Sequence, residues 1–223
     1  MDSLLSNLKI GVPEKIYVKD PESSDLGKRI VEYSIILIDD IGFDSFTFKK
    51  LGKLIGSNES SIYRYFESKH KLLLYLSSWY WAWIEYQLVI ETHSLNTSER
   101  LEKAIEIVTR AIKEDSNFSH INEVVLNRIM VNENSKSFLT KEVDNENKDG
   151  YFVIYKRIVH RLRDMIKNIK PNYKFPSSLA STILEGSLHQ HFLKDHFTSI
   201  TDCNTETSPT TFMKNLVLNT LKS

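Results

Sequence analysis

The sequence predicts an all-α protein with a small N-terminal domain and a larger C-terminal one. Only seven glycines and five prolines interrupt the 223 residues, which favours helices. Apolar residues recur every three or four positions, and strand-like alternation is weak throughout. They make up 41% of the chain, enough for a sizeable core. We expect an arm at residues 1–24, a three-helix domain at 25–76 and a second helical domain at 77–223.

The first helix is expected to follow the N-terminal arm, which is partly irregular. Ser24 or Asp25 can cap this helix, because short polar side chains accept from free backbone N–H groups. Gly42 is expected to end it. Between these limits one apolar face repeats at steps of four, three and four residues, formed by Leu26, Ile30, Tyr33 and Leu37.

Two short helical patterns joined by a tight turn come next. Thr47 begins the first and is placed to cap it, and Gly56 ends it. Asn58 is placed to cap the second, directly after the turn Gly56-Ser57-Asn58. Two short helices held at an angle by such a turn form a helix-turn-helix, which carries its second helix into the DNA major groove.

Positive charge is concentrated around this turn. The whole chain has 29 basic and 29 acidic residues, so any contact with DNA must be local. Residues 46–71 contain six cations and two anions, a net charge of +4 in 26 residues. The alternative interpretation is a small helical subdomain with an ordinary solvated charged face. The cations are Lys49, Lys50, Lys53, Arg64, Lys69 and Lys71, and the anions are Glu59 and Glu67.

The second helix of the motif carries side chains suited to reading DNA. Ser60 and Ser61 are short and polar, as a helix entering the major groove requires near its N-terminus. Tyrosine hydroxyls can donate to phosphate, and cations at the start of a helix attract it. The predicted DNA-binding residues are Thr47, Lys49, Ser60, Ser61, Tyr63, Arg64, Tyr65 and Lys69.

The remaining chain reads as a series of longer helices. A fourth helix, capped by Ser68, is expected to run from Lys69 toward Glu91. The polar segment Ser135–Asn147 is consistent with either a helix start or a mobile loop. Pro209 suits the first turn of the last helix. The other expected helices are Ser98–Asp115, Phe118–Asn132, Tyr151–Ile169, Ser177–Phe197 and Pro209–Leu221.

Within residues 25–76, glycine, serine, aromatic and aliphatic residues recur at spacings that form a specific motif. The motif consists of Ile41-Gly42-Phe43, Thr47, Leu51-Gly52, Ile55-Gly56, Ser61-Ile62-Tyr63, Tyr65-Phe66, Ser68-Lys69 and Leu72-Leu73. It covers roughly a quarter of the chain and resembles the TetR family of bacterial transcriptional regulators. The resemblance implies that the positions of Thr47, Ser60, Ser61, Tyr63, Tyr65 and Lys69 lie at or near DNA.

The same resemblance implies a function for the C-terminal domain, namely binding a small effector and forming a homodimer. A dimer suits the task, because two recognition helices about 34–36 Å apart can read a palindrome in double-stranded DNA. In the family the last two long helices form this interface, here Ser177–Phe197 and Pro209–Leu221, with Gly186 allowing close approach. These same helices could instead merely close the core of the monomer.

The function that follows is a ligand-responsive DNA-binding regulator, a repressor released from a palindromic operator by a small apolar or aromatic effector. The alternative is a helical partner-binding or adaptor protein that keeps the fold without specific DNA binding. Neutral overall charge and Glu59 leave that alternative open. An enzyme is not expected, because the sequence has no Gly-rich phosphate loop, nucleophile elbow or paired catalytic carboxylates.

Two residues depart from the family pattern. Gly52 stands where alanine is usual, which costs about 1 kcal/mol of helix propensity but permits close packing. Glu59 stands where a neutral or basic residue is common. It could accept from a cytosine N4 amine, or it could only complement the helix dipole.

An aromatic cluster lies on the fourth helix, where all three tryptophans fall within five residues. Large aromatic side chains commonly form core, and pockets are also rich in them. A ligand that shifted this helix would move Lys69 at its start, which would couple the pocket to DNA. The predicted ligand-binding residues are Trp79, Trp83, Tyr86 and His189.

No metal or other cofactor is expected. Glu185, His189 and His196 approach one helical face, with His191 nearby, but the spacing matches no common metal motif. The single cysteine, Cys203, suits a reducing cytosol. No apolar run approaches the ~18 residues of a membrane span. We therefore expect a cytoplasmic protein without membrane contact.

Overall fold

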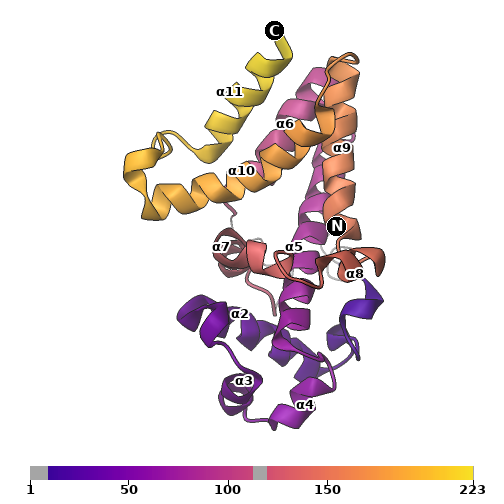
Figure 1. The fold of residues 1–223 in the computed structure, drawn as a ribbon, viewed down its shortest axis with the longest axis vertical. Coiled ribbons are helices and arrows are strands. Elements are labelled where there is room, and N and C mark those ends of the chain that lie inside the picture. Colours follow the sequence, from indigo (N-terminus) through magenta and orange to yellow (C-terminus); the bar gives the residue numbers. More distant parts are fainter. Residues whose placement is uncertain (1–9, 113–119, 223) are drawn as a thin grey trace. The chain divides into compact units, whose positions relative to one another are not determined.

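The computed structural model describes residues 10–112 and 120–222, and it confirms the all-α fold class (Figure 1). These residues contain helices and 3-10 turns and no strand. Their contacts divide the chain into two compact units. Unit 1 comprises Met1–Ala82 with Ile112–Val153, and unit 2 comprises Trp83–Ala111 with Ile154–Ser223. The helix α5 (Lys69–Thr92) begins in unit 1 and ends in unit 2.

Unit 1 starts with two 3-10 turns, η1 (Glu14–Ile16) and η2 (Pro21–Ser23), and the long helix α2 (Asp25–Ser45). Ser24 is the cap of α2, since its side chain accepts from the backbone N–H of Gly27. Gly42, which was predicted to end this helix, kinks it instead: its φ is 74°, a conformation that residues with a Cβ rarely adopt, and α2 continues to Ser45.

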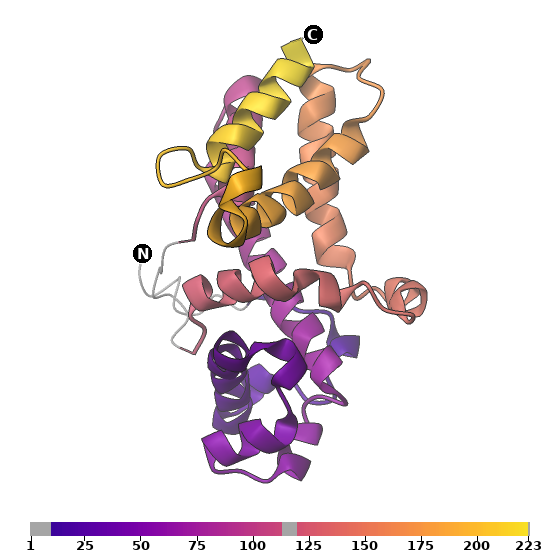
Figure 2. The same cartoon turned by 60° about the vertical axis from the view of Figure 1, so that its left-hand side comes forward.

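The helix-turn-helix consists of α3 (Phe48–Ile55) and the short α4 (Glu59–Tyr63), gathered with α2 around the start of α5 (Figure 2). Thr47 caps α3 by accepting from Lys50 N–H at 3.2 Å. Gly56 ends α3 in the left-handed region, at φ 63° and ψ 39°. Asn58 occupies the N-cap position of α4, but its side chain makes no capping hydrogen bond, which differs from the prediction.

The rest of unit 1 is built from α7 (Glu123–Glu133), η3 (Asn134–Ser137) and α8 (Val143–Lys148). The polar segment Ser135–Asn147 is therefore largely helical. The residues of this segment carry no apolar stripe, so their sequence alone does not distinguish a helix from a loop. α7 packs against α2.

Unit 2 contains α6 (Thr97–Thr109), α9 (Val153–Ile169) from Ile154 onward, α10 (Pro176–His196), η4 (Thr198–Ile200) and α11 (Pro209–Lys222). α6 is shorter than predicted, because the backbone is extended at Arg110. Ile112 therefore lies outside the helix, whereas Asp115 and Phe118 lie outside the described residues.

Gly186 brings α10 close to α11 within the chain itself. A Cβ on Gly186 would lie 2.8 Å from the terminal methyl of Met213, so only glycine fits without a shift of that side chain. The predicted close approach at Gly186 thus exists between two helices of the same subunit.

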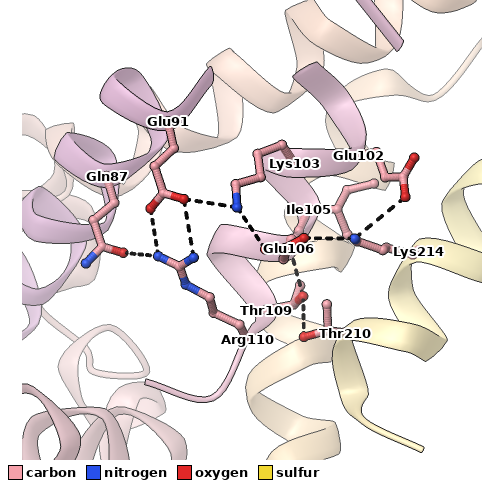
Figure 3. A network of polar contacts seen from close by, with 10 residues as sticks. All are labelled: Gln87, Glu91, Glu102, Lys103, Ile105, Glu106, Thr109, Arg110, Thr210 and Lys214. Carbon is pink, nitrogen blue, oxygen red and sulfur yellow. Dashed lines mark hydrogen bonds and ion pairs between the residues drawn. The ribbon is translucent and has the colours of Figure 1, made fainter. Parts of the chain in front are cut away.

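A polar network links the end of α5 to α6 and α11 (Figure 3). Lys103 forms ion pairs with Glu91 at 3.1 Å and Glu106 at 2.9 Å. Arg110 pairs with Glu91 at 2.8 Å, and Lys214 pairs with Glu106 at 3.0 Å. Hydrogen bonds from Lys103 and Lys214 lower the pKa of Glu106, so its carboxylate stays charged at neutral pH. The network fixes how these three helices meet.

Candidate nucleic-acid interface

The outer face of α4 presents polar and charged side chains to solvent. Ser60 and Arg64 are exposed, Ser61 is half-buried, and Tyr63 is 48% exposed. Ile62 is fully buried on the opposite face and anchors the helix to the core of unit 1. The sequence-predicted residues of α4 thus lie on one accessible surface, as a recognition helix requires.

Tyr63 is held in place by two contacts. Its ring meets Phe48 of α3 edge-on, with centroids 5.0 Å apart. Its hydroxyl donates to Glu59 Oε1 at 3.4 Å, one helical turn away. Glu59 thus orients a tyrosine on the exposed face, a role that neither sequence interpretation of Glu59 included.

Three cations around the turn carry charge that no neighbour neutralises. Lys49, Lys53 and Arg64 are exposed, and within residues 10–112 and 120–222 none of them forms an ion pair. Lys49 and Lys53 are four residues apart and therefore share one face of α3. Lys53 is absent from the sequence-predicted interface, although this spacing could have identified it. Lys50 instead donates to the Ser45 carbonyl at 2.8 Å.

Lys69 has a different environment from the one the sequence predicts. Its ammonium donates to three carbonyls where α2 ends and leads into α3: Phe43 and Asp44 of the last turn of α2 at 3.0 Å each, and the C-cap Phe46 at 3.2 Å. It also lies 4.8 Å from the centre of the Phe43 ring. An ammonium has three N–H donors, so these carbonyls can use all of them. Lys69 therefore braces the turn that leads into α3.

Tyr65 is also turned inward. The residue is only 4% exposed, and its hydroxyl lies 2.7 Å from Ser24 Oγ and 3.3 Å from Lys19 Nζ. The hydrogen bond with Ser24, followed by that with Lys19, lowers the pKa of Tyr65. The Tyr65 carbonyl accepts from Val18 N–H at 2.8 Å. Tyr65 thus ties the end of α4 to the N-terminal arm.

The turn between α2 and α3 is held from a second side by residues of α7 and η3. Glu133 Oε1 accepts from Phe43 N–H at 3.0 Å, and Lys136 pairs with the Asp44 carboxylate at 2.7 Å. Nearby, Arg128 pairs with Asp39 of α2 at 2.6 Å. Sequence analysis missed these residues, because each partner lies about ninety positions away and no local motif marks it.

Gly52 is required where α3 meets the turn. Ser57 N–H donates to the Gly52 carbonyl at 2.8 Å, and a Cβ on Gly52 would lie 2.7 Å from the Ser57 carbonyl oxygen. That neighbour is backbone and cannot rotate away. The glycine that departs from the family pattern therefore fits a particularly tight turn in this chain.

Gly52→Ala should lower the free energy of unfolding by up to about 2 kcal/mol. The overpacking cost of about 1–3 kcal/mol exceeds the gain in helix propensity of about 1 kcal/mol. Urea denaturation measures the difference. Gly11→Ala is the matched control, since no atom of the described residues lies within 4 Å of its added Cβ. A Gly52→Ala protein more stable than wild type would contradict the expectation.

The four predicted ligand-binding residues differ in burial and in the unit to which they belong. Trp79 belongs to unit 1, whereas Trp83, Tyr86 and His189 belong to unit 2. Trp79 and Trp83 are each 2% exposed, so both are core residues of their units. Tyr86 is half-buried, and His189 is exposed, with its ring stacked near Phe192 at 6.4 Å.

Unit 2 contains a cavity of about 350 Å³ at the end of α10. None of the four predicted ligand residues lines it. Its walls come from α10, the segment after η4, and α11: Gln190, Ile200, Thr201, Asp202, Cys203, Thr207, Thr211, Phe212 and Asn215.

The histidines and the glutamate of α10 have protein partners. His191 Nε2 lies 2.9 Å from the Thr109 carbonyl, and burial lowers the His191 pKa, so the neutral ring donates this hydrogen bond. Glu185 accepts from the Tyr155 hydroxyl at 2.6 Å. Across the part of the chain that the structure describes, no three His, Cys, Asp or Glu residues are grouped to hold a metal ion. No described helix is both long and apolar enough to cross a membrane.

Solved structures share the fold of this chain. AibR in complex with isovaleryl coenzyme A and operator DNA is 17% identical, with a TM-score of 0.55 over 85% of this chain and 96% of that one. A transcriptional regulator from Saccharomonospora viridis in complex with choline is 16% identical, with a TM-score of 0.59 over 89% and 97%. The superantigen PfiT is 17% identical, with a TM-score of 0.57 over 90% and 97%.

These identities show a common fold and no more, because one fold can host unrelated functions. No curated protein matches the sequence. The sequence model of bacterial regulatory proteins of the tetR family matches residues 30–76. That range spans most of α2, both helices of the helix-turn-helix and the first turns of α5. Residues 30–76 therefore form a helix-turn-helix domain of the tetR family of bacterial regulatory proteins.

Proposed function

We propose that the protein is a cytoplasmic repressor that binds a palindromic operator as a homodimer and is released by a small effector. The observation that carries this proposal is the accessible surface formed by α3 and α4. It combines exposed hydroxyls with cations that no described carboxylate neutralises. Such a surface suits a duplex, because phosphates need positive charge and base edges need short polar groups.

The proposed contacts divide into two classes. Lys49, Lys53 and Arg64 bind phosphate, together with the Thr47 hydroxyl and with the Tyr63 hydroxyl, which turns from Glu59 to a phosphate oxygen. Ser60 and Ser61, in the first turns of α4, approach base edges. Lys69 and Tyr65 act indirectly, because they hold α4 and the turn before α3 in position.

The homodimer would form through α10 and α11, as the family resemblance implies. Apolar side chains on these elements remain exposed in the single chain: Phe197 by 52%, Phe212 by 41% and Leu216 by 37%. Phe212 and Leu216 are one helical turn apart and thus form one stripe on α11. A second copy of the same stripe is the simplest partner for it in a two-fold symmetric pair.

The effector is proposed to be a small apolar or aromatic molecule bound by the C-terminal helices. Support comes from two fold neighbours whose structures contain small molecules, isovaleryl coenzyme A and choline. Trp83, Tyr86 and His189 remain the candidate ligand residues of unit 2, and Trp79 would act as packing on the same helix. Burial of Trp83 favours a role in shaping the wall of this effector site.

The test is the salt dependence of DNA binding. We expect Lys49→Ala and Arg64→Ala each to weaken binding to every duplex by about threefold to tenfold. Each should also reduce the slope of log K against log[salt] by about one, because one phosphate contact is lost. Fluorescence anisotropy on an operator selected from random duplexes measures both quantities. Lys167→Ala, an exposed cation on α9, is the control and should change neither.

The same experiment separates the repressor from an adaptor. A repressor binds with two chains per duplex, and Ser61→Ala alters the ratio between the selected operator and a scrambled sequence. An adaptor that only retains the fold binds no duplex even at low salt, and that result would overturn the proposal.

A further inference from the structure

A second cavity lies in unit 1, between the N-terminal arm and α5, with a volume of about 230 Å³. Its floor is Tyr75 of α5, which is only 2% exposed. This cavity belongs to unit 1, whereas Trp83, Tyr86 and His189 belong to unit 2. It is therefore a different site from the effector site proposed above. Its walls are Ile10, Gly11, Val12, Glu14, Tyr17, Asp20, Glu22 and Tyr75.

The lining of this cavity is acidic and aromatic. Glu14, Asp20 and Glu22 contribute three carboxylates, and the described part of the lining contains no lysine, arginine or histidine. Tyr17 and Tyr75 contribute two rings that meet edge-on, with centroids 6.1 Å apart and planes at 75°. Rings set at such an angle can present a face and an edge to the same guest.

The carboxylates are fixed in position. Asp20 Oδ1 accepts from Glu22 N–H at 2.9 Å, which caps η2. Glu22 Oε1 lies 2.8 Å from His120 Nε2 and accepts from the Tyr75 hydroxyl at 3.4 Å. Both contacts of Glu22 fall on the same oxygen. Burial, followed by the charges of Glu22 and Asp20, raises the pKa of Tyr75 above its usual range, so the negative potential of these carboxylates reaches the cavity floor.

We propose that this cavity binds a small organic cation, an amine or a quaternary ammonium group. Aromatic faces attract such cations through the ring quadrupole, and neighbouring carboxylates add direct charge attraction. The apolar residues Ile10 and Val12 suit the methyl or methylene groups that surround an organic cation. An inorganic metal ion fits less well, because the described carboxylates do not converge as a metal-binding group.

The cavity wall is joined directly to the end of the recognition helix. Val18 follows the lining residue Tyr17, and its N–H donates to the Tyr65 carbonyl at 2.8 Å. Tyr75 packs edge-on against Phe66, with centroids 5.3 Å apart. A bound cation therefore orders the same arm that holds the residues following α4.

The experiment titrates the full-length protein, free of DNA, with choline as the quaternary ammonium probe. Isothermal titration calorimetry compares choline with 3,3-dimethylbutan-1-ol, its neutral isostere, in which carbon replaces the charged nitrogen. We expect saturable binding of choline and about tenfold weaker binding, or none, of the neutral alcohol. The variants Tyr17→Leu and Glu22→Gln should each weaken choline binding by about tenfold.

Two matched variants keep the features that the proposal needs. Tyr17→Phe retains the ring and should retain the affinity. Glu32→Gln removes a carboxylate of α2 outside the lining and should change nothing. Thermal unfolding identifies a variant that has merely lost its fold. If Tyr17→Leu does not fold, weaker choline binding by Glu22→Gln and unchanged binding by Tyr17→Phe test the proposal.

Several outcomes would overturn the proposal. They are no saturable choline binding by wild type, equal binding of the neutral isostere, or choline affinity unchanged in both Tyr17→Leu and Glu22→Gln. The last result would place the probe elsewhere in the chain. None of these measurements involves DNA. Their failure therefore leaves the proposed repressor function intact, and choline can bind this cavity even in a protein that binds no operator.

Discussion

Lys69→Met should lower the free energy of unfolding by about 2–4 kcal/mol and weaken DNA binding without changing its salt dependence. The methionine keeps an unbranched apolar side chain but removes the Lys69 donor from the carbonyls of Phe43, Asp44 and Phe46, of which Phe43 still accepts from Phe46 N–H at 3.3 Å. Hydrogen bonds from a charged donor are worth about 1.5–3 kcal/mol each, and partial access of water reduces the sum. Urea denaturation and anisotropy titrations over a range of salt measure the two effects.

The slope of the salt titration decides between a brace and a phosphate contact. If Lys69 only supports the end of α2, its replacement lowers stability and affinity but leaves the slope of log K against log[salt] as in wild type. A phosphate contact reduces that slope by about one and leaves stability nearly unchanged. Lys49→Met is the matched control for the second pattern, because Lys49 is exposed and supports no described carbonyl. The opposite result at Lys69 would restore the assignment made from sequence.

Replacing Arg157 and Arg161 together with methionine should lower the free energy of unfolding by about 2–4 kcal/mol at neutral pH. Both arginines of α9 bind Glu85 of α5, with closest contacts of 2.5 Å and 2.9 Å. The side chain of Glu85 is only 9% exposed. Removing both partners leaves a buried carboxylate uncompensated, which costs more than losing a surface ion pair. Arg163→Met is the control, since Arg163 pairs only with the exposed Asp164.

The same cluster predicts how stability depends on pH. Burial tends to raise the pKa of Glu85, but hydrogen bonds and charge from Arg157 and Arg161 outweigh it and lower the pKa below the ordinary 4.5. A carboxyl with a lowered pKa stabilises the fold above its unfolded pKa, and that contribution is lost as the pH falls through the folded value. Denaturation midpoints measured from pH 7 down to about 3 should fall less steeply in Glu85→Gln than in wild type. Parallel curves would contradict this account.

The parts of the fold that the sequence could predict are those set by interactions between residues close together in the chain. Ser24, Thr47 and Gly56 act on backbone groups within about four positions, so each helix boundary that they set was visible in the sequence. The end of α6 was not, because the apolar period continues through Ile112 although the chain becomes extended at Arg110. Tertiary context overrides periodicity at such places.

The candidate interface likewise contains residues whose positions the sequence predicts and residues whose positions it does not. Exposure of Ser60, Tyr63 and Arg64 follows from helical geometry once Ile62 is placed inside. The positions of Lys69 and Tyr65 do not, because a lysine suits a phosphate as well as a cluster of carbonyls. Which partner it has depends on segments more than twenty residues away in the chain.

The sequence by itself determined that the chain is all-helical, that residues 30–76 are a helix-turn-helix of the tetR family, and that positive charge gathers there. These properties rest on hydrophobic period, capping and turn chemistry, which act over a few residues. Only the tertiary structure decided which cations face solvent, which ones brace the turn, and that three acidic residues of the arm meet Tyr75 around a cavity. Such contacts join distant segments, and their energy depends on burial and distance, which no local pattern encodes.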